Sequence, residues 1–442
     1  MRPIPDPCKE RTWLALMNGS GCPAATKQPV TIMSYNILCQ KLVRRSLFPY
    51  AGKASLKWKR RKDMLLNELM YWSSDIMCLQ EVGIEHWYES FAPCFKVNGY
   101  DSRMFCSAFK SHGVTISWKK SKFHVVDELG ISMDNTMQVC GEVLKTKNVA
   151  LIVVLRAGPT PGTPPSTNTA AGDADASLNI SSNGGGSVPG IIISNTHLFW
   201  VPGACYERLQ QQIAMLRGLK SIQQKYPGFP VISCGDFNTT PDDAGYDLLT
   251  KSRPVNLNEW QLDNLLPRTI SDNDNSDGTQ DNSDKEPALD ASSVLDDNAQ
   301  PPLSYATIAM TSAEENKEAA NTKRRKLEEE EHKLEEQLKI DSERVQRLVK
   351  AIQDDYQPMQ SCYGTYSELD PSYRTEQWHG EPIFTNYAIW KGTLDYIFFT
   401  PETTSLVLRE VLSLPAEKRM KPGLPNDTFP SDHVSLIARF DM

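Results

Sequence analysis

Two short polar segments contain residue types that could hold a metal ion beside a phosphate ester. Residues 234–238 read Cys-Gly-Asp-Phe-Asn, and residues 429–433 read Phe-Pro-Ser-Asp-His. Each adjoins an apolar run typical of a β-strand, so its acid, amide and imidazole groups should lie at a strand end. Mg²⁺ prefers oxygen ligands, and it polarises phosphoryl oxygens and activates water. The two segments therefore indicate metal-assisted cleavage of a phosphate ester.

Four further segments share this design, in which a polar group ends or opens an apolar run. They are Ser34-Tyr35-Asn36, Leu79-Gln80-Glu81, Asn195-Thr196-His197 and Leu394-Asp395-Tyr396. Each segment alone is equally compatible with a turn or a structural role. Six in one chain favour a shared site, because strand ends of packed sheets are rigid enough to position metal ligands.

The residue types suggest a role for each group at such a site. We expect Glu81 to bind Mg²⁺ directly, with Mn²⁺ as an alternative ion. Asn36 should orient Glu81 or add an oxygen ligand, and Asp432 should belong to the same metal site. Asp236 can orient or deprotonate the attacking water, and Asn238 can donate a hydrogen bond to the scissile phosphate.

The two histidines are expected to have different partners. His433 can pair with Asp395, which would fix its tautomer and raise its basicity. His197 can stabilise the charge that develops on phosphorus in the transition state. These residue types do not decide which group is the general base.

The elements that must position these groups alternate along the chain. Apolar, β-branched runs predict strands at 30–38, 75–81, 113–118, 149–155, 191–198, 231–234, 394–400 and 435–440, and helical patterns predict helices at 56–72, 205–223 and 242–250. Because these strands are almost continuously apolar, we expect sheets that are covered on both faces. The pattern predicts one large α/β domain.

Three stretches are expected to lie outside the core of that domain. Residues 1–28 are predicted to be a disordered tail, and residues 29–442 a single catalytic domain with a flexible insert at 157–189 and an acidic and helical insert at 268–355. The second insert has a heptad pattern, which includes Leu338, Val345 and Ile352. It predicts a helix with a protein partner at 323–352, or a solvated helix without one.

Composition is compatible with a nucleic-acid substrate in a reducing compartment. The net charge is −8, but residues 271–300 hold nine acids and one base, so the remainder is balanced. No apolar run approaches the ~20 residues of a membrane span. The ten cysteines form no Cys-x-x-Cys pair, as expected of buried thiols in the cytoplasm or nucleus. Of two Lys-Arg-Arg-Lys runs, at 59–62 and 323–326, we favour the second as a nuclear-import signal.

Four motifs together have a recognisable pattern. They are residues 196–200 (Thr-His-Leu-Phe-Trp), 235–241 (Gly-Asp-Phe-Asn-Thr-Thr-Pro), 384–387 (Phe-Thr-Asn-Tyr) and 391–398 (Lys-Gly-Thr-Leu-Asp-Tyr-Ile-Phe). Through them the chain, from about Thr31 to Phe440 outside the inserts, resembles the endonuclease/exonuclease/phosphatase superfamily, and within it the carbon-catabolite-repressor-type deadenylases. A finer resemblance to fungal RNA 3′-exonucleases lies in residues 44–49 with 56–58, and in 197–200 with 206–208.

The resemblance implies a fold, an activity and a set of substrate contacts. The fold would be a four-layer α/β sandwich of two packed mixed β-sheets flanked by helices, as in DNase I. The activity would be metal-dependent 3′→5′ hydrolysis from an RNA 3′ end that releases 5′-mononucleotides, including trimming of ribosomal RNA. Trp390, in place of the usual Phe, would stack on a base near Pro202, and Asn386 and Arg208 would also bind substrate.

Other readings of the sequence stay open at this point. A 2′-5′ oligoadenylate phosphodiesterase or a phosphoinositide phosphatase would share the fold. A non-catalytic RNA-binding adaptor would be signalled by loss of Glu81, Asp236 or His433, and all three are present. The segment from Lys41 to Lys62 has nine bases and no acid. It predicts an RNA contact, or a solvated helix face with a buried Trp.

Overall fold

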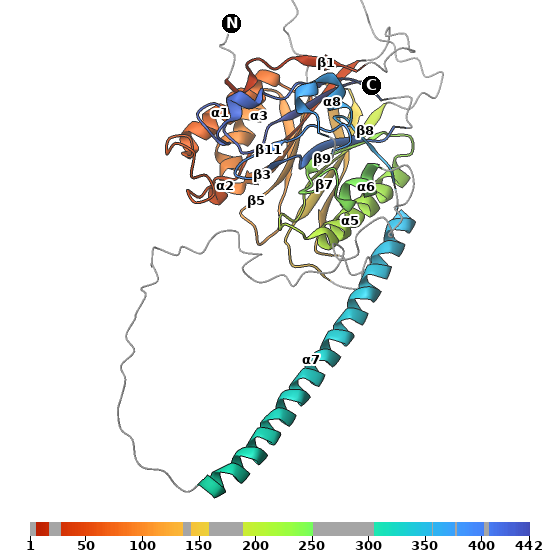
Figure 1. The fold of residues 1–442 in the computed structure, drawn as a ribbon. Helices are drawn as coiled ribbons and strands as arrows, with labels where there is room; N and C mark the ends of the chain where they lie inside the picture. Colours follow the sequence, from red (N-terminus) through yellow and green to blue (C-terminus); the bar gives the residue numbers. More distant parts are fainter. Residues whose placement is uncertain are drawn as a thin grey trace, which may run out of the picture. The chain divides into compact units, whose positions relative to one another are not determined.

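The structure, a computed structural model, describes residues 6–16, 28–135, 143–158, 189–250, 305–355, 357–375, 378–401 and 406–442. The chain divides into a unit of residues 1–277 and 347–442 and a second unit of residues 278–346. In the first unit two mixed β-sheets pack face to face between layers of helices (Figure 1). The predicted four-layer α/β sandwich is thereby confirmed.

The first sheet has seven strands. Their order is β1 (Trp13–Ala15), β14 (Val407–Leu412), β15 (Leu436–Asp441), β2 (Pro29–Asn36), β3 (Ile76–Gly83), β5 (His112–Lys119) and β4 (Tyr100–Phe105). Only β2 and β3 run parallel among these neighbours, and β15 is antiparallel to β2. The end of β2 therefore lies beside the end of β3 and the start of β15.

The second sheet has six strands and the same local plan. Their order is β10 (Gln360–Ser361), β13 (Asp395–Phe399), β9 (Val231–Asp236), β8 (Gly190–His197), β7 (Val149–Ala157) and β6 (Phe123–Ser132). Here β8 and β9 are the parallel pair, and β13 is antiparallel to β9. A separate hairpin joins β11 (Asn386–Tyr387) to β12 (Lys391–Gly392).

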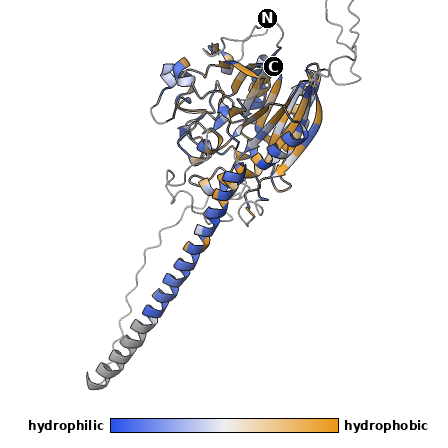
Figure 2. Cartoon of the chain, turned by 90° about the vertical axis from the view of Figure 1, so that its right-hand side faces the viewer, coloured by the Kyte–Doolittle hydropathy of each residue, from blue (hydrophilic) through white to orange (hydrophobic). Residues whose placement is uncertain are grey.

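Side-chain alternation along the strands builds two kinds of core. On β2, Val30 and Ile32 point into the layer between the sheets, whereas Met33 and Tyr35 pack on the other face with Leu65. The helices α1 (Trp58–Trp72), α2 (Ile84–His86) and α3 (Ala92–Val97) cover this outer face, and α5 (Cys205–Lys225) and α6 (Ala244–Thr250) cover the second sheet. The strands are accordingly apolar (Figure 2). The short helices α8 (Tyr366–Leu369) and α9 (Glu417–Met420) lie in connecting segments.

The prediction of a disordered tail at 1–28 is wrong for residues 6–16. Strand β1 pairs with β14, and buried Arg11 donates hydrogen bonds to the carbonyls of Ser413 and Ser435, each at 2.7 Å. Its guanidinium also lies 3.8 Å from the Glu68 carboxylate of α1. A three-residue strand has no periodic pattern, and the partners of Arg11 are about 400 residues away, so the sequence carries no local sign of this docking.

The two inserts are described only in part. Residues 159–188 of the first and 268–304 of the second lie outside the described residues. The expected helix is α7 (Tyr305–Asp355), whose coloured part is mostly hydrophilic (Figure 2). Leu334 and Leu338 are exposed, whereas Leu348 and Ile352 are buried. A protein partner at 323–352 stays a prediction. None of the described helices is long and apolar enough to cross a membrane.

Candidate active site

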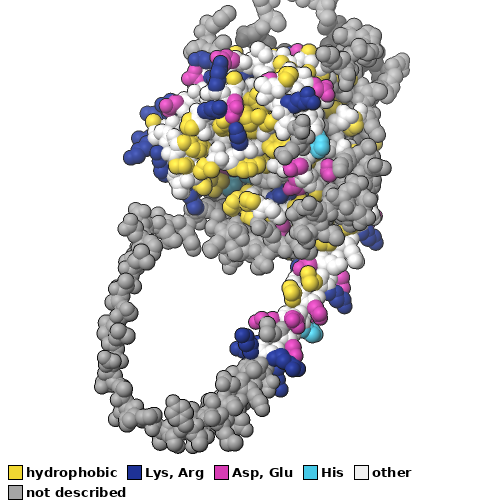
Figure 3. All heavy atoms as spheres, viewed as in Figure 1, with side chains coloured by type: hydrophobic (Ala, Val, Ile, Leu, Met, Phe, Trp, Pro, Cys, Tyr) yellow, Lys and Arg dark blue, Asp and Glu magenta, His cyan; other side chains and the backbone are white. Residues whose placement is uncertain are grey.

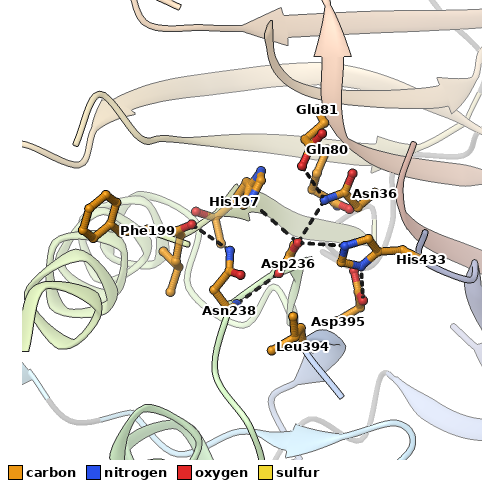
Figure 4. Close-up of polar contacts among 12 residues, drawn as sticks. Asn36, Gln80, Glu81, His197, Phe199, Asp236, Asn238, Leu394, Asp395 and His433 are labelled. Atoms are coloured by element: carbon orange, nitrogen blue, oxygen red, sulfur yellow. Dashed lines mark hydrogen bonds and ion pairs between the residues drawn. The ribbon is translucent and has the colours of Figure 1, made fainter. Parts of the chain in front are cut away.

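Sheet topology brings the predicted polar residues to one edge of the sandwich. Asn36 and Glu81 lie at the ends of β2 and β3, and His197 and Asp236 end β8 and β9. Asp395 opens β13 directly opposite Asp236, because β13 is antiparallel to β9. His433 precedes β15, which begins beside the end of β2 at Ser34. Figure 4 shows these side chains around Asp236.

The amide of Asn36 links the carboxylates of the two sheets. Its Nδ2 donates to Glu81 Oε1 at 3.0 Å and to Asp236 Oδ2 at 2.9 Å. Its Oδ1 accepts the Leu38 N–H at 3.0 Å, which fixes the amide orientation. Of the two predicted roles for Asn36, the arrangement matches orientation of Glu81, since the amide oxygen already faces a backbone donor.

A β-bulge turns Glu81 toward this network. The register of β3 against β5 shifts between Leu79 and Val82, and Glu81 has a left-handed φ of 55°. Its Oε2 accepts the Cys39 N–H at 2.9 Å. Burial tends to raise the pKa of Glu81, but neighbouring His197, His112 and these hydrogen bonds together lower it.

The Gly-Asp-Phe-Asn segment holds Asp236 at the centre of the site. A Cβ at Gly235 would lie 2.4 Å from the Thr196 carbonyl oxygen of β8, so only glycine fits there. Asp236 Oδ1 accepts the N–H of Asn238 at 3.0 Å, and Asn238 has a left-handed φ of 47°. Asn238 Nδ2 donates to the Leu198 carbonyl at 3.0 Å, which leaves its second amide hydrogen for a ligand.

The predicted pairing of His433 with Asp395 is present. His433 Nδ1 lies 2.7 Å from Asp395 Oδ2, which also accepts the Thr385 hydroxyl at 2.6 Å. The Thr385 oxygen in turn accepts the backbone N–H groups of Leu394 and Asp395, both at 3.0 Å. Thr385 thus fixes the carboxylate that orients the imidazole. His433 Nε2 is directed at Asp236 Oδ2, 3.6 Å away (Figure 4).

The two histidines beside Asp236 differ in charge. His197 Nε2 also lies 3.6 Å from Asp236 Oδ2, but burial lowers the pKa of His197 to about 4. At His433 burial acts in the same direction, yet the carboxylates of Asp395 and Asp236 outweigh it and raise its pKa well above the usual value. Near pH 7 His197 is therefore neutral and His433 is a cation.

Asp432 lies beside this cluster and is less tightly held. Its carboxylate is within 3.4 Å of the Ser431 hydroxyl, and that hydroxyl also donates to the Asn36 carbonyl at 2.7 Å. Burial raises the pKa of Asp432 to about 6, with a further contribution from the charge of Glu81 and an opposing one from His433. The charges of Glu81 and His433 therefore both affect the Asp432 carboxyl.

The donor set fits a divalent cation. The candidate ligand atoms of Asp236, Asp395 and His433 lie within 4.8 Å of one another, and because His433 is protonated, the carboxylate oxygens are the atoms available to a cation. Asp395 Oδ1 is buried, and in the described part of the chain it has no hydrogen-bond partner. Burial raises the pKa of both aspartates, and the carboxylate beside each adds to that rise against the opposing effect of His433. With Glu81 bonded through Asn36 to Asp236, the site has the oxygen-rich chemistry that Mg²⁺ or Mn²⁺ requires.

The four predicted substrate-binding residues lie in the β11–β12 hairpin, in the loop after β8 and at the start of α5. Trp390, in the β11–β12 hairpin, is 52% exposed, and Asn386 of that hairpin bridges to His433. Pro202 is exposed in the loop after β8. Arg208 is buried, and its guanidinium donates to the Val201 carbonyl at 3.0 Å and to Asp243 at 3.1 Å. Arg208 supports the loop from beneath and does not face solvent.

Only some of the basic side chains from Lys41 to Lys62 are exposed to solvent. Arg61 is fully buried and donates to the carbonyls of Ile37, Leu38 and Pro430 at 2.6–2.8 Å. Trp58 stacks on His86 with ring centroids 3.8 Å apart. Trp58 is half-buried and packs against the core, which is closer to the alternative of a solvated helix face with a buried Trp. Other bases of the segment are exposed, and basic side chains gather on the left of the unit in Figure 3.

Sequence reasoning did not assign a role to several supporting residues. Gln80 Nε2 of β3 donates to Asn195 Oδ1 of β8 at 2.8 Å, and Asn195 Nδ2 donates to the Leu79 carbonyl at 2.9 Å. These buried amides join the two sheets beneath the site. Thr385 also went unassigned. Gln80, Asn195 and Thr385 do occur in the polar segments and motifs described above. Nothing in the sequence indicated which groups they would bond.

Comparison with known proteins places the chain in a family. Residues 33–433 match the model of the Endonuclease/Exonuclease/phosphatase family, and the chain belongs to that family. It is 29% identical to the "Probable RNA exonuclease C9B6.11c" of Schizosaccharomyces pombe, over 92% of this chain and 75% of the relative. It is 30% identical to the "Probable RNA exonuclease NGL3" of Saccharomyces cerevisiae, over 86% of this chain and 68% of the relative.

More distant matches agree with these. The "CCR4-Not complex 3'-5'-exoribonuclease subunit Ccr4" of Phaeosphaeria nodorum is 24% identical, over 99% of this chain and 63% of the relative. The crystal structure of "ANGEL2, a 2',3'-cyclic phosphatase" has a TM-score of 0.56 at 21% identity, over 98% of this chain and 99% of that one, and supports the fold. The resemblance to fungal RNA exonucleases and Ccr4-type proteins is confirmed.

Proposed function

We propose that this protein is a Mg²⁺- or Mn²⁺-dependent 3′→5′ RNA exonuclease that hydrolyses phosphodiester bonds and releases 5′-mononucleotides. The observation that carries the proposal is the convergence of Glu81, Asp236, Asp395 and His433 from both sheets at one edge of the sandwich, near a half-exposed indole at Trp390. The printed names of the fungal relatives support RNA as the substrate, and trimming of ribosomal RNA is the finer proposal.

The chain's own residues have distinct tasks in this reaction. Glu81 would hold the metal, with Asp432 nearby, and Asn36 orients Glu81. Bound Mg²⁺ or Mn²⁺ would polarise a phosphoryl oxygen and activate water. Asp236 orients the attacking water or takes its proton, and its position between Asn36 and the two histidines keeps it fixed.

Hydrogen-bond donors surround the place where charge develops on phosphorus. The free amide hydrogen of Asn238 can bond a phosphate oxygen. His433 is held as a cation by Asp395, so its Nε2–H can stabilise a phosphorane or protonate the leaving oxygen. His197 stays neutral and can donate a hydrogen bond without adding charge.

The substrate contact is assigned to the loops that flank the cluster. Trp390 stacks on the base of the 3′ nucleotide, with Pro202 nearby, and base–aromatic stacking is worth about 1–3 kcal/mol. Asn386 lies on the hairpin strand that bridges to His433, within reach of the same nucleotide. Arg208 contributes through the loop that it supports.

A product time course tests the proposal. RNAs with different 3′ tails and a 5′ label are incubated with the protein and Mg²⁺, and products are resolved by length and by chemistry. We expect 5′-mononucleotides and a ladder that shortens from the 3′ end. Internal fragments would indicate an endonuclease, and inorganic phosphate from a phosphoinositide would indicate a phosphatase. Hydrolysis of 2′-5′-linked oligoadenylate alone would favour that alternative, and RNA binding without cleavage would indicate an adaptor.

A further inference from the structure

The loop between β8 and α5 displays a large aromatic side chain beside the candidate active site. Trp200 is 57% exposed, whereas its two neighbours, Phe199 and Val201, are 2% and 8% exposed. The loop starts directly after His197, and the Leu198 N–H donates to the Asp236 carbonyl at 2.9 Å. An indole is thus turned outward at the point where the chain leaves the catalytic edge.

This outward position is enforced by the loop's anchors. Arg208 Nη1 donates to the carbonyls of Phe199 at 3.4 Å and Val201 at 3.0 Å, which flank Trp200 on both sides. Its Nη2 pairs with Asp243 at 3.1 Å, so the guanidinium is itself fixed. Arg208 is only 4% exposed and holds both flanking carbonyls, which stabilises the loop with the indole turned outward.

Two further contacts tie the loop to the site. Gln211 Oε1 accepts the Phe199 N–H at 2.9 Å, and Asn238 Nδ2 donates to the Leu198 carbonyl at 3.0 Å. Phe199, Val201 and Ala204 form a small buried cluster beneath the loop. A single exposed apolar side chain is ordinary on a protein surface. Trp200 differs from such a side chain because its loop is held by several hydrogen bonds, one of them from Asn238 of the candidate site.

A second half-exposed indole is connected to the other histidine of the site. Trp390 belongs to a hairpin that bridges to His433, as the Trp200 loop follows His197. Both histidines approach the same oxygen, Asp236 Oδ2, at 3.6 Å. The loops connected to the two histidines therefore each present an indole to solvent. A single-stranded nucleic acid has flat bases on both sides of any phosphodiester that reaches Asp236.

We propose that Trp200 is a second stacking platform, which holds an RNA base next to the nucleotide bound at Trp390. The inference rests on the proposed function, and it makes Arg208 a positioning residue that acts through Trp200. A base is the favoured occupant because stacking requires a rigid, exposed ring and tolerates any sequence. The platform would bind RNAs of two or more nucleotides better than a phosphodiester with a single nucleoside, which has only one base and cannot occupy both indoles.

Binding and turnover together test this proposal. The full chain is titrated in EDTA with an RNA that carries 2-aminopurine next to its 3′-terminal nucleotide. We expect fluorescence quenching with the wild type, and in Trp200→Ala loss of quenching with a roughly 5- to 150-fold higher Kd. Trp200→Tyr should retain most of the affinity. Tyr71→Ala, which removes a 42% exposed aromatic of α1, is the matched control and should leave Kd unchanged.

Kinetics with Mg²⁺ separate this inference from the proposed function. In Trp200→Ala, KM should rise for RNA and stay unchanged for a phosphodiester with a single nucleoside, with kcat little affected. Equal Kd and equal quenching in Trp200→Ala and the wild type would overturn the stacking role. Failure of the wild type itself to cleave RNA would refute the exonuclease instead, and an unchanged thermal unfolding midpoint in each variant shows that the fold is intact.

Discussion

At the scale of single residues, the site depends on groups that act through others. Asp395 orients His433, and the Thr385 hydroxyl holds Asp395 with a 2.6 Å hydrogen bond. The same hydroxyl oxygen accepts two backbone N–H groups, so its position is determined by the chain itself. Outer partners of this kind commonly change activity 10- to 100-fold when they are removed.

Replacing the Thr385 hydroxyl should therefore lower turnover. We expect Thr385→Val to reduce kcat about 10- to 100-fold with little change in KM, because His433 loses its fixed orientation. Thr385→Ser keeps the hydroxyl and should retain most of the activity. The measurement is steady-state hydrolysis of a 3′-labelled RNA, with the thermal unfolding midpoint as a check on folding. Equal kcat in Thr385→Val and the wild type would remove Thr385 from the site.

The candidate catalytic residues were easier to predict from the sequence than the residues that support them. Glu81 and Asp236 stood out because a carboxylate at the end of an apolar strand is unusual. Thr385 has an ordinary side chain in a loop, and nothing local distinguishes its role. Arg61 belongs to the basic segment that predicts an RNA contact, and the family resemblance implied that Arg208 binds substrate, yet both are buried against backbone carbonyls. Those carbonyls have no sequence signature, so burial of an arginine was not predictable here.

At the scale of elements, strand ends and hairpins set the geometry. The predicted strands that became β2, β3, β8 and β9 were recognisable because they are buried on both faces. Strands β4, β6 and β14 were not predicted, because partly exposed side chains interrupt their apolar pattern. The β11–β12 hairpin is short, and the Lys391 ammonium holds it to Glu417 at 3.0 Å.

Gly392 is required in this hairpin by the position of Trp390. A Cβ at Gly392 would lie 2.2 Å from Trp390 Cη2, so Gly392→Ala should displace the indole. We expect KM for RNA to rise roughly 5-fold or more, as stacking is lost. Hydrolysis of a small chromogenic phosphodiester, which has no base to stack, should be unaffected.

Gly52→Ala is the matched control for this change. A Cβ there meets only the Ser55 hydroxyl oxygen, at 3.3 Å, so the RNA KM should stay at the wild-type value. If Gly392→Ala also left the RNA KM unchanged, the stacking role of Trp390 would be refuted.

At the scale of the whole molecule, the site is assembled from distant parts of the chain. Asn36 bonds Glu81 and Asp236 across 45 and 200 residues, and Ser431 bonds the Asn36 carbonyl across 395 residues. Arg11 and Ser435 join the two ends of the chain across 424 residues. The polar segments could be recognised from sequence, but contacts over such separations depend on strand order, which local patterns do not encode.

The central claim is that this assembled cluster of carboxylates binds a divalent cation and uses it to cleave RNA. The most direct measurement is the rate of 5′-mononucleotide release by EDTA-stripped protein before and after Mg²⁺ is added, for the wild type and for Asp236→Asn. We predict no release without metal, recovery of the wild type with Mg²⁺, and a rate at least about 10²-fold lower in Asp236→Asn. Full activity of the stripped wild type, or equal recovery of Asp236→Asn, would contradict the claim.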